Sequence, residues 1–445
     1  ELAFCLLSEV TNDRRYKNLA KWMVETRGSR PSPFHAEYDD PVGKDLNKNY
    51  EPLVVADGAY SGAYFQDDMP LADQTAAVGH AVRAMYLFCG AADACESQGV
   101  QSALTTIWSN LVRKRMYVTG GIGSAGRNEG FTHDFDLPNR EAYAETCAAI
   151  GLVFWASRMS RLTGDSQYAD VMELALYNAA ISGVNFDTDR YFYVNPLESR
   201  GDHLRQPWFG CACCPPNIAR LVMSVQQYAA YKSDDGLTID LPFSAEYTFE
   251  TAGPPARVRV ESAYPWGGKV VVEVRAGGQF CMRLRVPRWQ KGIHSSLNGK
   301  HCDTFSHGYI VVDREWKVGD RLELSLAMKP EWLSCDSRVA DNVGRMALMN
   351  GPLVYCLEEA DLGVPVHLFR PDPSVDVTLQ SGTDARAKDV LVVTGGLEVV
   401  GPQEQLYVPF RSPVVDTTVA RFVPYFSWAN RTPGSMAVWL RRQEK

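Results

Sequence analysis

The N-terminal half of the chain repeats one hydrophobic pattern with the 3.6-residue period of helices. Residues 6–20 and 159–173 both carry Thr-[Asn/Gly]-Asp-x-x-Tyr between two segments with apolar periodicity. The aspartates, Asp13 and Asp165, suit the N-cap of the second helix, because a carboxylate accepts hydrogen bonds from free backbone N–H groups. A third helical pair is expected within residues 75–117. Repeated hairpins predict an α-solenoid or a closed α/α toroid with about seven helices.

The pattern changes to strict alternation of apolar and polar residues from Leu237 onward. Alternating segments occupy residues 256–262, 269–286, 308–313 and 321–328, with glycine-containing turns between several of them. Short alternating strands separated by turns are typical of an antiparallel β-sandwich. The fold class predicted is therefore multidomain, α followed by β.

A proline-rich break, FRPDPSVD at residues 369–376, precedes more strand-like segments such as LVVTGGLEVV at 391–400. We interpret this break as a second domain boundary. The predicted domains are a helical domain over 1–235, a β-sandwich domain over 236–365 and a small β-rich domain over 366–445.

Composition narrows the classes of function. The chain has 445 residues, of which 45% are hydrophobic and 22% charged, as in a globular protein with several domains. It has no run of 18 apolar residues that could span a membrane. Its net charge is −8 and its 45 basic residues form no long block, which argues against a nucleic-acid partner. A neutral small molecule is the ligand that these numbers favour.

Most of the 11 cysteines are isolated, unlike those of small secreted disulfide scaffolds. A reducing compartment is favoured, and we predict a cytoplasmic protein. The first residues, ELAFCLLSEVT, have no initiator methionine and resemble the middle of an amphipathic helix. We therefore expect the N-terminus of the natural protein to be missing, which leaves a signal peptide open.

One cysteine cluster is different. The segment WFGCACCPPNIARLV, residues 208–222, places Cys213 and Cys214 directly before two prolines and a helical pattern, so a turn before the helix is expected. With Glu145 and Cys147 of EAYAETCA they supply three thiolates and a carboxylate, a set that suits tetrahedral zinc. We expect Cys211 to point elsewhere. The spacing alone leaves a structural zinc site or a reduced cysteine cluster equally open.

Other candidate residues lie in less specific contexts. The glycine-rich segment 117–139 follows no strand and has no Gly-Lys-[Ser/Thr], so it is expected to cover a site rather than bind phosphate. Glu129 and His133 are the titratable residues that this segment could bring to the site. Without other information, a lone glutamate in a loop is more often a solvated surface residue. His80 lies in a helix with apolar neighbours, where a lone histidine is more often a core residue than a functional one. The aromatic segment 190–198 suits either the core or a sugar subsite.

Together these motifs resemble glycoside hydrolase family 127, the β-L-arabinofuranosidases. The resemblance rests on VTGGIGS, DLPN, AYAETCA, RYFYVNPLE, WFGCACCPPNIAR and GHAVRAMYL, with MNGPLVYCLEEAD and PYFSWANRTPGSMAVWLR further along, and covers nearly the whole chain. It implies an (α/α)6 barrel followed by antiparallel β-sandwich domains. A complete barrel of this kind would have twelve helices. The count of about seven helices therefore fits a barrel whose N-terminal part is missing from this sequence. The family also has a histidine in a segment just upstream of ELAF, which this sequence lacks.

The resemblance also implies the roles of the candidate residues. It implies four zinc ligands, namely Glu145, Cys147, Cys213 and Cys214. Cys213 would be the nucleophile and Glu129 the acid/base, while His80 and Tyr193 would contact the sugar. A zinc-bound cysteine is deprotonated at neutral pH, so it can replace the usual carboxylate nucleophile of a retaining glycosidase.

The expected function is that of a retaining glycoside hydrolase that releases L-arabinofuranose from β-L-arabinofuranosides. One alternative is the same chemistry on another furanoside or on a branched pectic sugar residue. Another is a carbohydrate-binding protein without catalysis, whose Cys3Glu zinc is structural. The expected partner is a small-molecule or oligosaccharide substrate, with no nucleic acid and no membrane, and a homodimer is left open.

Overall fold

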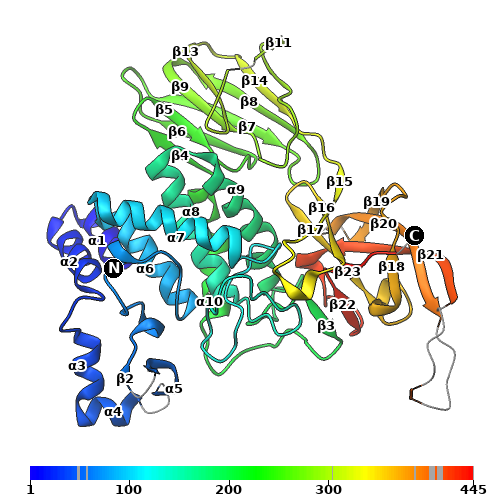
Figure 1. Ribbon diagram of the computed structural model, residues 1–445. Helices are drawn as coiled ribbons and strands as arrows, with labels where there is room; N and C mark the ends of the chain where they lie inside the picture. Colours follow the sequence, from blue (N-terminus) through cyan, green and yellow to red (C-terminus); the bar gives the residue numbers. More distant parts are fainter. Residues whose placement is uncertain are drawn as a thin grey trace.

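The computed structural model describes residues 1–47, 51–56, 59–302, 304–384, 387–399, 406–407 and 414–443. It has a helical N-terminal half followed by several β-sheets (Figure 1). The change from helix to strand lies where the period of the hydrophobic pattern changes, between helix α10 (Cys214–Ser224) and strand β4 (Ala230–Ser233). No helix in the described part of the chain is long and apolar enough to cross a membrane.

The repeated helical pairs are confirmed. Helix α1 (Leu2–Thr11) is followed by α2 (Arg14–Thr26), and α8 (Thr146–Thr163) by α9 (Ser166–Leu174). Asp13 caps α2 by accepting the Arg15 N–H at 3.0 Å, and Asp165 caps α9 by accepting the Gln167 N–H at 2.9 Å. The third pair is α6 (Ala81–Ala94) and α7 (Gln98–Lys114).

The count of about seven helices was too low, since the described residues contain ten α-helices. The missed helices are α3 (Pro33–Asp39), α4 (Pro41–Asn47) and α5 (Glu51–Val54), near the short strands β1 (Val55–Ala56) and β2 (Ala59–Tyr60). Each of these helices has two turns or fewer, so a 3.6-residue period cannot be recognised in it. At the centre of the helical half, α8 buries most of its residues on all sides and packs against α6, α9 and α10.

The predicted β-sandwich is present as two sheets that enclose a shared apolar core. One sheet has the order β11 (Lys300–His301), β10 (Ser295–Leu297), β14 (Arg321–Ser325), β8 (Lys269–Ala276), β7 (Ala256–Ser262), β6 (Ala245–Phe249). The other has the order β12 (Phe305–Ser306), β13 (Tyr309–Trp316), β9 (Gly278–Arg285), β5 (Gly236–Ile239), β4. The pairing differs from the expected purely antiparallel one, because β5 and β9 run parallel.

The third β-structure is a ten-stranded sheet that combines distant parts of the chain. Its strands are β15 (Pro330–Leu333), β16 (Arg345–Asn350), β17 (Leu353–Glu358), β18 (Phe369–Pro371), β19 (Thr378–Asp384), β20 (Ala387–Val399), β21 (Val414–Pro424), β22 (Ser435–Ala437), β23 (Leu440–Arg441) and β3 (Glu198–Arg200). Strand β3 comes from the helical half and pairs with β22. Residue 400, at the end of a predicted strand, lies outside the described residues, and the domain limits 235 and 365 stay a prediction.

A buried ion-pair cluster joins the helical half to the sandwich. Arg285 of β9 is 2% exposed and contacts Asp170 at 2.6 Å and Glu173, both from α9. Its Nε also donates to the backbone oxygen of Asp240 at 2.5 Å. The guanidinium thus fixes α9 against the β-sandwich.

Candidate metal centre and active site

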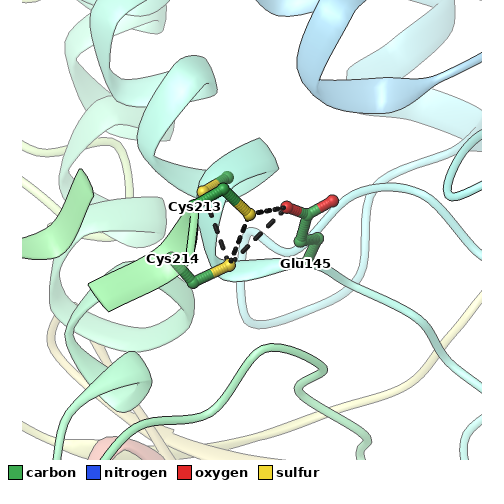
Figure 2. Close-up of side chains that lie close together, drawn as sticks. Glu145, Cys213 and Cys214 are labelled. Carbon is green, nitrogen blue, oxygen red and sulfur yellow. Dashed lines mark hydrogen bonds between the residues drawn. The ribbon is translucent and has the colours of Figure 1, made fainter. Parts of the chain in front are cut away.

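Three cysteines and a glutamate converge at one point, as the sequence predicted (Figure 2). The Cys213 Sγ lies 3.4 Å from Glu145 Oε1 and 3.6 Å from Cys214 Sγ. The Cys214 Sγ lies 3.6 Å from the same Glu145 oxygen and 3.4 Å from Cys147 Sγ. All four ligand atoms lie within 4.8 Å of one another. Cys211 is exposed and is not a member of this group. The charge of Cys213 nevertheless raises the pKa of the Cys211 thiol, so the two side chains lie close enough to interact and the expectation that Cys211 points elsewhere is not confirmed.

The four residues come from the N-termini of two helices. Glu145 is the N-cap of α8 and Cys147 lies in its first turn. Cys213 is the N-cap of α10 and Cys214 its first residue. The expected turn before the helix is therefore shorter than predicted: Cys213 already has helical backbone angles, with φ −83° and ψ −47°. Both helix dipoles present their positive ends to the cluster, which favours thiolates and a carboxylate there.

A hydrogen-bond network that sequence reasoning missed holds the Glu145–Cys147 segment. The Thr146 N–H donates to Tyr193 O at 2.9 Å and its hydroxyl donates to Phe192 O at 2.8 Å. The buried Asn195 amide donates to Thr146 Oγ1 and to Ala144 O, both at 2.9 Å. Two features of the sequence could have indicated this network: Thr146 stands between two ligand residues, and Asn195 lies in the FYVNP segment. Thr146 and Asn195 are positioning residues.

The protein surroundings of the cluster disfavour a negative charge on Glu145. Burial, followed by the charges of Cys213 and Glu129, raises the pKa of Glu145 to about 9. Hydrogen bonds from Cys147 and Cys214 hold the pKa of Cys213 well below its usual range, and the pKa values of those two partners are raised in turn. Among the described residues no lysine or arginine pairs with Glu145, and its Oε2 is buried without a hydrogen-bond partner.

The donor set fits a metal ion. A tetrahedral ion with metal–sulfur bonds of about 2.3 Å separates two sulfur ligands by about 3.8 Å. The sulfur–sulfur distances of 3.4 and 3.6 Å are close to this spacing. Three thiolates and one carboxylate are ligands that zinc accepts. The cluster can therefore bind a metal ion with little rearrangement.

A second group lies beside the cluster and contains His80 and Glu129. The His80 Nε2 is 3.3 Å from Glu129 Oε2, and both residues lie within 4.8 Å of a Glu145 oxygen. His80 is the N-cap of α6, not an internal helix residue as expected, and its Nδ1 accepts the Val82 N–H at 3.2 Å. This contact assigns the proton to Nε2, which lies beside the Glu129 carboxyl. Burial, with a smaller effect of Arg83, lowers the pKa of His80 to about 4, so the ring is neutral at pH 7.

Two glycines bring this pair together. Gly130 lies so close to Gly79 that a Cβ atom on Gly130 would be 1.9 Å from the Gly79 carbonyl oxygen. The contact is closed by hydrogen bonds from Phe131 N to Gly79 O at 2.9 Å and from Ala81 N to Glu129 O at 3.0 Å. The glycine-rich segment therefore does carry a polar group to the site. His133, the segment's other candidate, is exposed.

Tyr193 completes the group around Cys213. Its hydroxyl lies 3.1 Å from the Cys213 Sγ, where it can donate to a thiolate. Its ring makes edge contacts with Tyr143 and Phe209, with centroid distances of 6.1 and 5.5 Å. The segment 190–197 has only isolated bridges at Tyr191 and is not the strand that its aromatic residues suggested.

Family models match three consecutive parts of the chain. Residues 1–227 match the catalytic domain of β-L-arabinofuranosidases of glycoside hydrolase family 127, residues 236–328 match the middle domain and residues 330–441 match the C-terminal domain. The chain belongs to glycoside hydrolase family 127. It is accordingly an enzyme, and its fold is that of family 127 structures.

Relatives of this family 127 chain extend over almost its whole length. It is 35% identical to a non-reducing end β-L-arabinofuranosidase of Bifidobacterium longum subsp. longum, over 99% of this chain and 70% of the relative. The structure of a family 127 β-L-arabinofuranosidase from Geobacillus stearothermophilus T6 matches with a TM-score of 0.90 and 37% identity. The match covers 99% of this chain and 71% of that protein. The structure of a further family 127 β-arabinofuranosidase matches with a TM-score of 0.86 and 31% identity. This match covers 99% of this chain and 68% of that protein.

Two residues near Glu145 in this glycoside hydrolase, Cys213 and Glu129, are less buried than the other members of the two groups to which they belong. Cys147 and Cys214 are 2% and 1% exposed, whereas Cys213 is only half-buried. The Glu129 side chain is 40% exposed. A sugar can therefore reach the Cys213 sulfur and the Glu129 carboxyl, whereas the other two sulfurs are covered by protein.

Proposed function

We propose that this enzyme is a retaining β-L-arabinofuranosidase that binds zinc through Glu145, Cys147, Cys213 and Cys214. In this proposal Cys213 is the nucleophile and Glu129 is the acid/base. The observation that carries it is the accessibility of one sulfur in an otherwise buried ligand set. A purely structural site needs no reachable sulfur and no carboxylic acid beside it.

Zinc bound here would keep the Cys213 thiol deprotonated at neutral pH and hold its sulfur in place. The residues of the chain perform the remaining work. The two helix N-termini and the Tyr193 hydroxyl stabilise negative charge on the sulfur. The Thr146–Asn195 network sets the direction in which Glu145 and Cys147 point.

In the first step an electron pair of the Cys213 sulfur forms a bond to the anomeric carbon, and the bond from that carbon to the leaving oxygen breaks. Glu129 transfers its proton to that oxygen, so the aglycone leaves as a neutral alcohol. In the second step water attacks the anomeric carbon, the carbon–sulfur bond breaks and the thiolate returns. Glu129 takes the proton from the water. Two inversions give net retention.

His80 and Tyr193 are the proposed sugar contacts. The Nε2 of His80 lies 3.3 Å from the Glu129 carboxyl, and the neutral ring adds no positive charge beside the anomeric carbon. Tyr193 lies at the sulfur, where its hydroxyl is also within reach of a bound furanose. We also infer that the helical half belongs to an (α/α)6 barrel, which the repeated helical pairs and the family 127 structures support.

The test of the substrate uses aryl furanosides that differ only in the sugar. We expect the zinc-loaded enzyme to hydrolyse the β-L-arabinofuranoside and to ignore the α-L-arabinofuranoside and the β-D-galactofuranoside. NMR recorded during the first turnovers should show β-L-arabinofuranose before it equilibrates. If the enzyme prefers another furanoside, the proposed substrate is wrong and the proposed catalytic residues are unaffected. A product of inverted configuration would contradict the role of Cys213 as nucleophile.

A further inference from the structure

We propose that a second site, formed by strands of the ten-stranded sheet, binds an acidic glycan that carries carboxylate groups. The site is a cavity of about 600 Å³ lined in part by residues of β3, β18, β22 and β23. Figure 1 shows where these strands lie. This volume lies in the range of about 300–1,000 Å³ that small-ligand sites have. None of the proposed catalytic residues lines it.

The charge of the cavity is opposite to that of the protein. Four arginines, Arg200, Arg345, Arg370 and Arg441, line it together with two glutamates. The lining therefore has a net charge of +2, whereas the whole chain has a net charge of −8. A concave cationic surface on an acidic protein attracts anions selectively.

The two glutamates are already engaged. Glu198 pairs with Arg345 at 2.9 Å, and Glu359 accepts the N–H and the hydroxyl of Ser435, each at 2.8 Å. Arg370 pairs with Glu398, outside the lining, at 3.0 Å. Both glutamates therefore have hydrogen-bond or ion-pair partners, although no arginine or lysine of the described residues pairs with Glu359.

Arg200 and Arg441 differ from the other two arginines. Within the described ranges neither forms an ion pair with a carboxylate, and both are exposed. They also line an adjoining cavity of about 340 Å³, so both stand at the wall that the two cavities share. A guanidinium binds a carboxylate with two parallel hydrogen bonds, so two neighbouring arginines suit a chain with repeated carboxylates.

The remaining lining suits a sugar. Trp439, Ala437 and Val366 give apolar surface for the C–H face of a ring, and the Arg345–Glu198 pair gives donors and acceptors for hydroxyls. Glu198 of the cavity lies five positions after Tyr193 of the catalytic group. Their Cα atoms are therefore at most about 18 Å apart. One glycan can place its furanose at Cys213 and its acidic part in the cavity. The choice of a glycan over another polyanion rests on the proposed function.

The test measures binding by calorimetry and needs no catalysis. The probes are a tetramer of a hexuronic acid and its carboxyl-reduced neutral counterpart. We expect the acidic tetramer to bind at least tenfold more tightly, with an affinity that falls as salt is added. The double variant Arg200→Gln/Arg441→Gln should weaken it at least tenfold. The control Arg257→Gln/Arg321→Gln removes the same charge from exposed arginines of β7 and β14 and should leave binding unchanged.

Three results would overturn the proposal. The neutral tetramer could bind equally well, the control could weaken binding equally, or inorganic phosphate could bind as tightly as the tetramer and displace it. Both double variants should hydrolyse a small aryl furanoside at the wild-type rate. Loss of furanoside hydrolysis in the wild-type enzyme would count against the proposed function alone, because tetramer binding is measured independently.

Discussion

Two clusters with buried acidic groups, one around Arg285 and one around Glu145, differ in how their charge is neutralised. Asp170 and Glu173 meet Arg285, a cation that the chain itself supplies. Burial opposes ionisation of Arg285, but Glu173 and Asp170 raise its pKa further above its usual range. Glu145 meets three thiols instead, and no arginine or lysine pairs with it in the described part of the chain. A buried acidic cluster that lacks its own cation either holds its protons or binds a cation from solution, and the donor set of this one can bind a metal ion.

The difference separates a structural cluster from a functional one. The Arg285 cluster is closed, since its guanidinium and the Glu173 carboxylate are almost fully buried. The cysteine cluster leaves Cys213 accessible and has Glu129 within reach of Glu145. Substitutions in the first cluster should therefore change stability, and those in the second should change catalysis.

The largest effect is expected from the nucleophile. Cys213→Ser should reduce kcat by about 10⁴-fold or more, because loss of a nucleophile removes the covalent route even with a good leaving group. Steady-state hydrolysis of an aryl β-L-arabinofuranoside measures it. Cys211→Ser, an exposed position two residues away, is the matched control and should keep wild-type turnover. Substantial activity in Cys213→Ser would make the cysteine cluster structural, like the Arg285 cluster.

The next effect depends on the leaving group. Glu129→Gln should lose about 10²–10⁴-fold on an alkyl arabinofuranoside, the usual size of general acid catalysis. On an aryl substrate with an excellent leaving group the first step needs no proton, so a rapid burst of phenol should precede slow turnover. Equal losses on the two substrates would show that Glu129 acts on structure and not as the acid.

Arg285→Met should lower the free energy of unfolding by about 3–5 kcal/mol, because it removes the cation that pairs with Asp170 and with the buried Glu173. Denaturant unfolding with and without a zinc chelator should give the same difference. Arg283→Met, which removes an exposed pair with Asp235 from the same strand, is the control and should lower it by about 0–1 kcal/mol. A loss in Arg285→Met that appears only with zinc would mean that the two clusters are not independent.

The smallest effect concerns His80 and pH. Its folded-state pKa of about 4 lies below its usual 6.5, so the unfolded chain binds a proton between these values and the folded protein does not. Stability should therefore fall as pH drops from 6.5 to 4, by at most about 3 kcal/mol, and this component should then level off. In His80→Gln this pH-dependent component of the stability should be absent. Parallel stability curves for the two proteins across this range would contradict a buried neutral His80.

Signals that are local in sequence predicted the fold well. Asp13 and Asp165 each marked a helix start, and alternation located β7 and β8, because both rest on contacts between near neighbours. The parallel pairing of β5 with β9 was missed, since pairing between distant strands leaves no mark in either one. The same holds for β3, which joins a sheet built mainly from residues beyond 330.

The cysteine cluster was predictable because ligand residues of unusual type stand close together in two short motifs. The hydrogen bonds that hold the cluster in place could not be predicted. Asn195 lies far from Thr146 in sequence, and an asparagine before a proline indicates only a turn. His80 also escaped correct placement, because apolar neighbours extend the helical pattern through the residue that caps it. The chemistry of the site was therefore visible in sequence, and its geometry was not.

The central claim is that the cluster without its own cation makes Cys213 a nucleophile, and peptide mapping by mass spectrometry tests it most directly. Zinc-loaded Glu129→Gln should be mixed briefly with an activated aryl β-L-arabinofuranoside, quenched and digested. We expect a pentosyl adduct on Cys213, which accumulates because the variant lacks the base for the second step. An adduct on a carboxylate, or no adduct despite a burst of phenol, would contradict the claim.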